Sequence, residues 1–264
     1  MATFNYSSLE YFDSIYLKEM DRVKLMNRID AKFWTDLAHF NNLLDQLKNE
    51  YLILEEGKER AISYKTTYYD TQDDMLYMHH HNKKEKRFKI RKRTYIASKT
   101  NFLEIKYKSS DGRTVKERIK TGDNHHHFTK EEKEFIEVST GESILRFTPK
   151  LESKFQRITL VNKFLPERVT IDVSPVFKTK EGRLRLNNLV IIEIKNDGEN
   201  LNSFILELLE KEEIRKTSFS KYCIGRALLD PTIKQQNFET EISKLVERIF
   251  VEISPEEQLV ITEN

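Results

Sequence analysis

Basic and apolar side chains alternate along a series of segments in this chain, and this alternation restricts its fold more than any other feature of the sequence. In residues 87–96 the alternate positions are basic, namely Arg87, Lys89, Arg91 and Arg93. Successive side chains of a β-strand point to opposite faces of the sheet, so the segment predicts a strand with one basic and one apolar face. The same pattern recurs in residues 101–109, 114–121, 155–161, 168–173 and 189–195.

Two arrangements of such a sheet are open. In the simpler one, the charged face is exposed to water and the apolar face covers a core. The charges, however, are biased toward Lys and Arg over all these strands, whereas solubility is served better by mixed signs. In the other arrangement the sheet closes into an antiparallel β-barrel, with its apolar face outward beneath helices and its basic face lining a tunnel. We favour the barrel, and we therefore predict an α+β fold.

A tunnel lined by cations also predicts the chemistry of its ligand. Crowded cations repel one another and lose hydration, and a bound polyanion offsets both costs. Arg offers forked donors that match phosphate oxygens, and Lys offers a compact charge. A few carboxylates share the basic faces, chiefly Glu193 and, as a second candidate, Glu104. Such groups could hold a hard divalent cation that bridges phosphates, so the pattern favours metal-dependent phosphoryl transfer.

Composition argues against several other classes of protein. The chain has 264 residues, which fits one domain, and only 7 glycines, with neither a GxGxxG nor a GxxxxGK[ST] phosphate loop. Any phosphate binding must therefore use side chains. The single cysteine, Cys223, allows no disulfide within the chain. The N-terminus lacks the pattern of a signal peptide, and no apolar run approaches the roughly 20 residues of a membrane span. We therefore expect a cytoplasmic protein.

Helices are expected before, between and after the strands. Thr35 and Asp36 are both N-cap candidates for a helix at residues 36–50, and Thr129 with Glu132 has the capping-box pattern of a helix at 129–139. Further helices are predicted at residues 7–20, 73–81 (or a turn there), 202–215, 220–229 and 238–250, and further strands at 24–34, 51–54 and 61–70. The last helix carries an apolar stripe that we expect to dock on the barrel, with a contact between two copies of the chain as the alternative.

Several short motifs follow one another over most of the chain. They are Asp30-Ala31-Lys32-Phe33-Trp34, Tyr69-Asp70-Thr71, Ile90-Arg91-Lys92-Arg93-Thr94-Tyr95, Phe102-Leu103-Glu104-Ile105-Lys106, Val115-Lys116-Glu117-Arg118, Phe155-Gln156-Arg157, Ile192-Glu193-Ile194-Lys195, and Phe219-Ser220-Lys221-Tyr222 followed by Gly225. No motif is decisive alone. Their order and spacing together resemble the VTC domain, which is the polyphosphate polymerase domain of the vacuolar transporter chaperone complex and a triphosphate tunnel metalloenzyme.

This resemblance implies a closed barrel of eight antiparallel strands. It also implies transfer of the γ-phosphoryl group of ATP, or of another nucleoside triphosphate, to a growing polyphosphate chain with Mn²⁺ or Mg²⁺. Carried over by position, the phosphate-binding residues would be Lys32, Arg91, Arg93, Lys106, Lys116, Arg157, Ser220 and Lys221. Of these, the catalytic ones would be Arg91, Arg93, Lys106 and Arg157, and the metal ligand would be Glu193. The chain departs from the family pattern at Ser218, where a Lys is common.

The resemblance also implies the domain organisation. We expect a single tunnel domain over residues 1–264, with a core at about 22–229 and a C-terminal helical extension at 230–264.

Other functions remain open from the sequence. Attack by water instead of a phosphate chain would make the protein a hydrolase of inorganic or nucleoside triphosphate. A third alternative is a module that binds polyphosphate without catalysis, but a metal carboxylate such as Glu193 favours an enzyme. We expect no nucleic-acid partner, because RNA-binding sheets usually expose aromatic side chains on the basic face. The histidine runs at 79–81 and 125–127 are not expected to share a metal, since consecutive histidines on a helix point in different directions.

Overall fold

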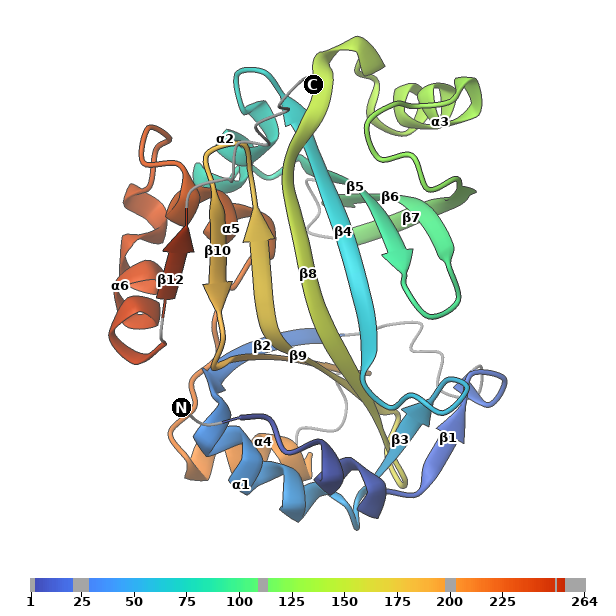
Figure 1. Cartoon of the computed structure of the whole chain (residues 1–264), viewed down its shortest axis with the longest axis vertical. Helices are drawn as coiled ribbons and strands as arrows, with labels where there is room; N and C mark the ends of the chain where they lie inside the picture. The colour runs from blue at the N-terminus through green and yellow to red at the C-terminus, as the bar shows by residue number, and fades with distance from the viewer. Residues whose placement is uncertain (1–2, 21–28, 109–113, 198–202, 250, 255–264) are drawn as a thin grey trace, which may run out of the picture.

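The computed structural model describes residues 3–20, 29–108, 114–197, 203–249 and 251–254. Within these ranges, one twelve-stranded sheet forms the framework and helices pack along it (Figure 1). Eight strands follow one another in antiparallel order: β7 (Thr114–Thr121), β6 (Thr100–Lys108), β5 (Arg87–Tyr95), β4 (Ile62–Thr71), β8 (Phe147–Asn162), β9 (Glu167–Lys178), β11 (Leu189–Asn196) and β2 (Ile29–Asp36). Helices around an antiparallel sheet confirm the predicted α+β class.

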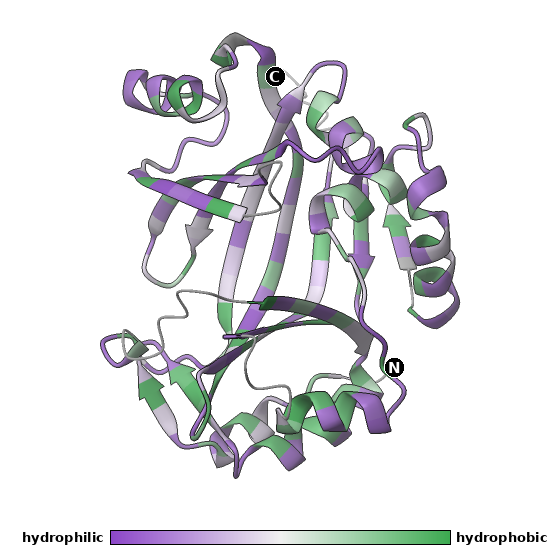
Figure 2. Ribbon diagram, turned by 180° about the vertical axis from the view of Figure 1, so that it is seen from behind, coloured by the Kyte–Doolittle hydropathy of each residue, from purple (hydrophilic) through white to green (hydrophobic). Residues whose placement is uncertain are grey.

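The remaining described strands extend this sheet at its margins. They are β3 (Tyr51–Glu55), which pairs with β8 and with β1 (Ser14–Tyr16), and β10 (Arg183–Leu186), which lies between β9 and β12 (Val251–Ser254). The segments predicted at 155–161 and 168–173 are parts of the longer strands β8 and β9. Hydrophilic and hydrophobic positions alternate along the long strands, as Figure 2 shows.

The basic face of the sheet is concave. Side chains from all eight antiparallel strands line one cavity, so the charged positions point inward as predicted. Among the described residues, however, no backbone pairing joins β2 to β7. The inward orientation of the basic face is therefore confirmed, whereas closure into a complete barrel stays a prediction.

Helices cover much of the outer, apolar face of the sheet. The pair α1 (Leu37–Leu47) and α4 (Phe204–Lys211) packs against β2, β8, β9 and β11, and α2 (Met75–His81) with α3 (Lys130–Thr140) covers β4, β5 and β6. Of the two candidate caps, Thr35 and Asp36, it is Asp36 that caps α1: its carboxylate accepts a hydrogen bond from the amide of His39 (3.1 Å). Thr129 and Glu132 form the predicted capping box of α3.

Helix α5 (Lys221–Leu229) is the exception to the expectation that all helices pack outside the barrel. Its residues Tyr222 and Ile224 join Tyr68, Leu151 and Phe177 in one apolar cluster, and both Tyr68 and Tyr222 line the cavity. The helix therefore lies on the concave side of the sheet. The physical reason is that α5 has buried residues on nearly all sides of the helix and not along a single stripe. A helix of this kind must be enclosed by other elements.

The two ends of the chain also differ from expectation. The helix predicted at 7–20 is a short 3₁₀ helix, η1 (Tyr6–Tyr11), followed by β1, because residues 14–16 pair with β3 instead of continuing the helix. At the other end, α6 (Glu239–Arg248) is followed by β12, so the C-terminal extension is not helical throughout. Residues 24–28 and the turn at Asp111-Gly112 lie outside the described residues. No helix within the described ranges has the length and apolar character required to cross a bilayer.

Candidate functional site

The concave face of the sheet encloses a cavity of about 390 Å³, which we call the tunnel. Its lining contains all nine residues to which the family resemblance assigned roles, but not Glu104, the second metal-ligand candidate. The nine are Lys32, Arg91, Arg93, Lys106, Lys116, Arg157, Glu193, Ser220 and Lys221. Seven different elements supply them, so only the fold brings them together. Their placement in one cavity agrees with the expectation, and their roles in binding stay predictions.

The tunnel has a large excess of positive charge. Among the described residues, eleven Lys and Arg side chains line it, against four carboxylates. Each strand contributes because every second residue along it points to the inner face, and many of these residues are charged. Such an excess inside a cavity is electrostatically costly when no anion is bound, and it is the arrangement that attracts a polyanion.

Two buried carboxylates hold four of the cations in place. Glu104 accepts a hydrogen bond from Nε of Arg91 (2.8 Å) and pairs with Lys116. Burial alone would raise the pKa of Glu104, but the charges of Arg91, Arg93 and Lys116 hold it well below its usual range. Glu104 therefore positions cations and is committed to them. This geometry speaks against the second metal-ligand candidate that the sequence offered.

Asp172 plays the same part on the opposite wall. It accepts two hydrogen bonds from Arg157 (2.5 and 2.7 Å) and also pairs with Lys221 at the start of α5. Burial by itself would raise the pKa of Asp172, and the two cations nevertheless hold it well below its usual range. Asp172 was not among the predicted site residues. The alternation along residues 168–173 placed it on the basic face and was the signal that could have found it.

Arg93 is held differently. Within the described part of the chain it forms no ion pair or hydrogen bond with a carboxylate, although it feels the charge of Glu104; its Nε donates to Thr66 Oγ1 (3.2 Å). Its guanidinium lies 5.4 Å and 5.9 Å from the ring centres of Tyr64 and Phe155, so aromatic faces take the place of an anion. Burial, and then the charge of Arg91, lower the pKa of Arg93. Arg93 is therefore a buried cation whose charge is left for a ligand.

The first residues of α5 face cations from other strands. The hydroxyl of Ser220 caps α5 by accepting from the amide of Cys223 (3.3 Å), and it also accepts from Nζ of Lys89 (3.2 Å). Burial lowers the pKa of Lys89 to about 7, and Lys32, Lys106 and Arg91 contribute to the shift. Lys89 lies in the tunnel but was not in the predicted set, although the alternation had placed it on the basic face.

Glu193 is the carboxylate best suited to a metal ion. One of its oxygens pairs with Lys195 (3.0 Å), and the register places it beside Lys32 and Thr170. Burial would raise the pKa of Glu193, but Lys195, Lys32 and Arg157 hold it well below its usual range, so it is ionised at neutral pH. The hydroxyl of Thr170 is buried and has no hydrogen-bond partner among the described residues. The described residues contain no group of three or more His, Cys, Asp or Glu side chains that could hold a metal ion. Glu193 and Thr170 would therefore supply only part of a Mg²⁺ or Mn²⁺ site, and substrate phosphates and water would supply the other ligands.

Further tunnel residues escaped the predicted set. They include Asp30, Glu56, Tyr64, Tyr68, Lys89, Arg118, Arg168, Thr170, Asp172, Lys195 and Tyr222. Most of them lie on the basic faces that the alternation predicted, although the predicted set itself was taken from the family resemblance. Ser218, by contrast, is exposed and does not line the tunnel, so the departure from the family pattern lies outside the cavity.

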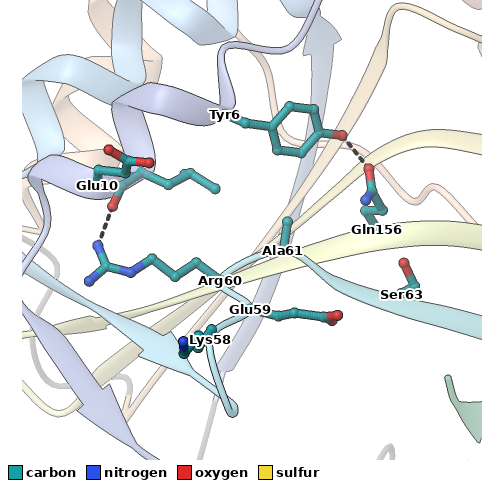
Figure 3. Close-up of a pocket in the computed structure, with 9 residues that line it drawn as sticks. Tyr6, Glu10, Lys58, Glu59, Arg60, Ala61, Ser63 and Gln156 are labelled. Carbon is teal, nitrogen blue, oxygen red and sulfur yellow. Dashed lines mark hydrogen bonds between the residues drawn. The ribbon is translucent and has the colours of Figure 1, made fainter. Parts of the chain in front are cut away.

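A second cavity, of about 540 Å³, lies outside the tunnel between η1 and the ends of β4 and β8 (Figure 3). Its charges have both signs, and Arg60 is already bonded to the backbone oxygens of Leu9 and Phe12 and to Glu55. Although this cavity is larger, it lacks the cationic excess of the tunnel. Charge therefore identifies the tunnel as the candidate site.

Comparison with known proteins supports the tunnel fold. The sequence model of the VTC domain matches residues 27–230. A candidate adenylate cyclase from Bacillus halodurans has a similar structure, with a TM-score of 0.52 and 14% identity, covering 80% of this chain and 97% of that one. A candidate adenylyl cyclase from Hippeastrum, described as having a dominant triphosphatase activity, has a TM-score of 0.46 and 13% identity, covering 76% and 94%. No curated protein matches the chain. At these identities the structural likeness concerns the fold alone.

Proposed function

The chain belongs to the VTC domain family, and from this premise we propose that it transfers the γ-phosphoryl group of ATP to the end of a polyphosphate chain inside the tunnel, with Mn²⁺ or Mg²⁺. The observation that supports this function is the lining of the tunnel. Its cations outnumber its carboxylates, and an ionised carboxylate, Glu193, stands beside an unpartnered hydroxyl. A triphosphate with a divalent cation is a ligand that fits both features.

The proposed reaction needs positioning and electrostatic stabilisation more than a covalent nucleophile. A terminal oxygen of the polyphosphate attacks the γ-phosphorus, the bond to the β,γ-bridging oxygen breaks, and ADP leaves with that electron pair. The transition state is loose and spreads charge over the equatorial oxygens. Arg91, Arg93 and Arg157 would stabilise this charge, and Lys106 would assist them. Glu193 would hold a metal ion, which when bound would offset negative charge on the phosphates.

Closure of the barrel is part of the same proposal. We expect the eight strands from β7 to β2 to close around a bound phosphate chain. The lining of the cavity supports this closure: Lys32 on β2 and Lys106 on β6 line the same cavity, and the charge of Lys32, after burial itself, lowers the pKa of Lys106. A cytoplasmic location and self-association through α6 also stay predictions.

The proposal is tested by incubating the purified protein with ATP, Mn²⁺ and a short polyphosphate primer. Chain length is followed on gels, and free phosphate is measured in parallel. We expect the primer to lengthen. Free phosphate without longer chains would replace the polymerase with a triphosphatase, and tight polyphosphate binding without any turnover would replace both with a binding module.

Binding of inorganic triphosphate at pH 8 is expected to take up protons. Burial and neighbouring cations lower the pKa of Lys89 to about 7, and those of Lys116 and Lys221 to about 8, despite the partial compensation that Glu104 and Asp172 give the latter two. These amines are partly neutral in the empty tunnel at pH 8, and a bound polyanion raises their pKa again. Uptake of roughly one to two protons should appear as a buffer-dependent binding enthalpy in calorimetry.

The same pKa shifts predict how stability depends on pH. Because the folded-state pKa values lie below the unfolded value of 10.5, the unfolded chain binds more protons between about pH 7 and 10. These groups therefore raise the free energy of unfolding of the empty protein as the pH increases through that window. Lys89→Met should weaken both effects, and a binding enthalpy that is the same in buffers of different ionisation enthalpy would contradict the assignment.

A further inference from the structure

Helix α5 carries Ser220 and Lys221 into the tunnel, but neither residue fixes the place of the helix. Lys221 pairs with Asp172, and Ser220 accepts from Lys89. Both contacts involve groups that a phosphate chain would compete for. The position of α5 must therefore be set by contacts made with groups that a phosphate chain does not compete for.

One such contact is a buried hydrogen bond between α5 and the segment that leads into α2. The hydroxyl of Tyr222 donates to Oδ2 of Asp70 (2.5 Å), and the side chains are 2% and 0% exposed. The same carboxylate accepts from the amides of Leu76 and Tyr77 (2.8 Å each) in the first turn of α2. Burial raises the pKa of Asp70, although these hydrogen bonds act against the shift. Asp70 thus joins α2 and α5 through one rigid carboxylate.

A second contact lies one turn farther along α5. Arg226, which is 4% exposed, donates to both carboxylate oxygens of Asp74 (2.7 and 3.2 Å) and to Asp230 (3.1 Å). Asp74 adopts a left-handed backbone conformation (φ 57°), which a residue other than glycine takes only at a cost. The carboxylate needed to hold Arg226 gives a reason for a residue with a side chain at this position.

The opposite side of α5 is closed against the sheet. A Cβ atom added at Gly225 would lie 2.8 Å from Cδ1 of Phe177 and 3.0 Å from Cδ2 of Leu151. The helix therefore has no room to move toward β8 and β9. Two carboxylates hold α5 on one side and the sheet limits it on the other, so the depth to which Ser220 and Lys221 enter the tunnel is fixed.

We propose that Asp70 and Asp74 are positioning residues for phosphate binding, acting through Tyr222 and Arg226 to hold α5 at the depth where Ser220 and Lys221 meet the substrate. This inference rests on the proposed function of the tunnel and adds to it a part of the structure that does not touch the phosphates. Loss of the contacts that Asp70 and Asp74 make with Tyr222 and Arg226 should loosen α5 and weaken phosphate binding, while the other cations of the lining stay in place.

The test uses the full chain with Tyr222→Phe, Asp74→Asn and the double variant. Asn tolerates the left-handed conformation, so Asp74→Asn removes the charge without adding strain. Tyr77→Phe is the matched control, because Tyr77 belongs to the same cluster but donates to the backbone oxygen of Lys234 (2.8 Å). We measure the affinity for inorganic triphosphate by calorimetry, amide exchange in α5, KM and kcat separately, and the thermal midpoint.

The double variant is expected to bind triphosphate about tenfold more weakly, with faster exchange in α5 and with KM affected more than kcat. Tyr77→Phe should change neither the affinity nor the exchange in α5. Unchanged exchange and affinity in the double variant, or an equal loss in Tyr77→Phe, would overturn the inference. If the unmodified protein itself fails to bind triphosphate, the proposed function fails, and exchange in α5 still decides whether Asp70 and Asp74 fix the helix.

Discussion

Replacing Glu193 with Gln is expected to lower turnover at least about 100-fold while metal-free binding of triphosphate stays intact or becomes tighter. A metal ion contributes several kcal/mol of transition-state stabilisation, and about 2.7 kcal/mol corresponds to a factor of one hundred. Glu193 is ionised and stands in a basic lining, so the amide removes a metal ligand and also a negative charge that repels phosphate. Turnover is measured against Mn²⁺ concentration, and triphosphate affinity is measured in a chelator.

Glu152→Gln is the matched control for this change. Glu152 lies on β8 outside the tunnel lining and pairs with Lys65 (2.9 Å) on the neighbouring strand. This variant should keep both turnover and metal dependence. Undiminished turnover of Glu193→Gln at low Mn²⁺ would remove Glu193 as the metal ligand and, with it, the metal-dependent mechanism.

The second large effect is a contrast between two tunnel arginines. Arg93→Met should lower turnover at least tenfold, about 1.4 kcal/mol, and should leave the thermal midpoint of the empty protein unchanged or higher. Arg93 forms no direct ion pair with a carboxylate in the described residues, and burial with the charges of Arg91 and Arg157 lowers its pKa despite the opposite effect of Glu104, so its removal relieves more repulsion than it loses attraction. Met keeps most of the volume between Tyr64 and Phe155. For Arg91→Ala we also expect turnover to fall at least about tenfold.

Arg157→Met should lower turnover as well, but it should also destabilise the protein. It leaves the carboxylate of Asp172, which is 2% exposed, with Lys221 as its remaining ionic partner. Breaking a buried pair in this way costs about 3 kcal/mol, which is roughly 5–10 °C in the thermal midpoint for a chain of this size. Turnover and thermal unfolding are measured for both variants. Normal turnover in both would exclude the tunnel as the reaction site, and equal loss of stability would contradict the distinction between free and committed cations.

Much of the lining could be predicted because its pattern is local, whereas Lys32, Ser220 and Lys221 were implied only by the family resemblance. A strand directs alternate side chains to opposite faces whatever surrounds it, so the basic face of β5 and the position of Glu193 followed from spacing. The caps at Asp36 and Thr129 are local in the same sense, since a cap satisfies amides within one turn of its own helix. These features needed no knowledge of distant parts of the chain.

What the sequence by itself determined about this protein is therefore which side chains share a face and what chemistry that face prefers. Only the tertiary structure decided that Glu104 and Asp172 are committed to cations while Arg93 is not, and that α5 lies inside the concave sheet beneath Asp70 and Asp74. The physical reason is that an ion pair or a helix position depends on distances between residues far apart in the chain. Burial makes an unpaired charge strongly costly, and a satisfied ion pair offsets that cost. No local sequence pattern shows which charged residues will be paired in the folded protein.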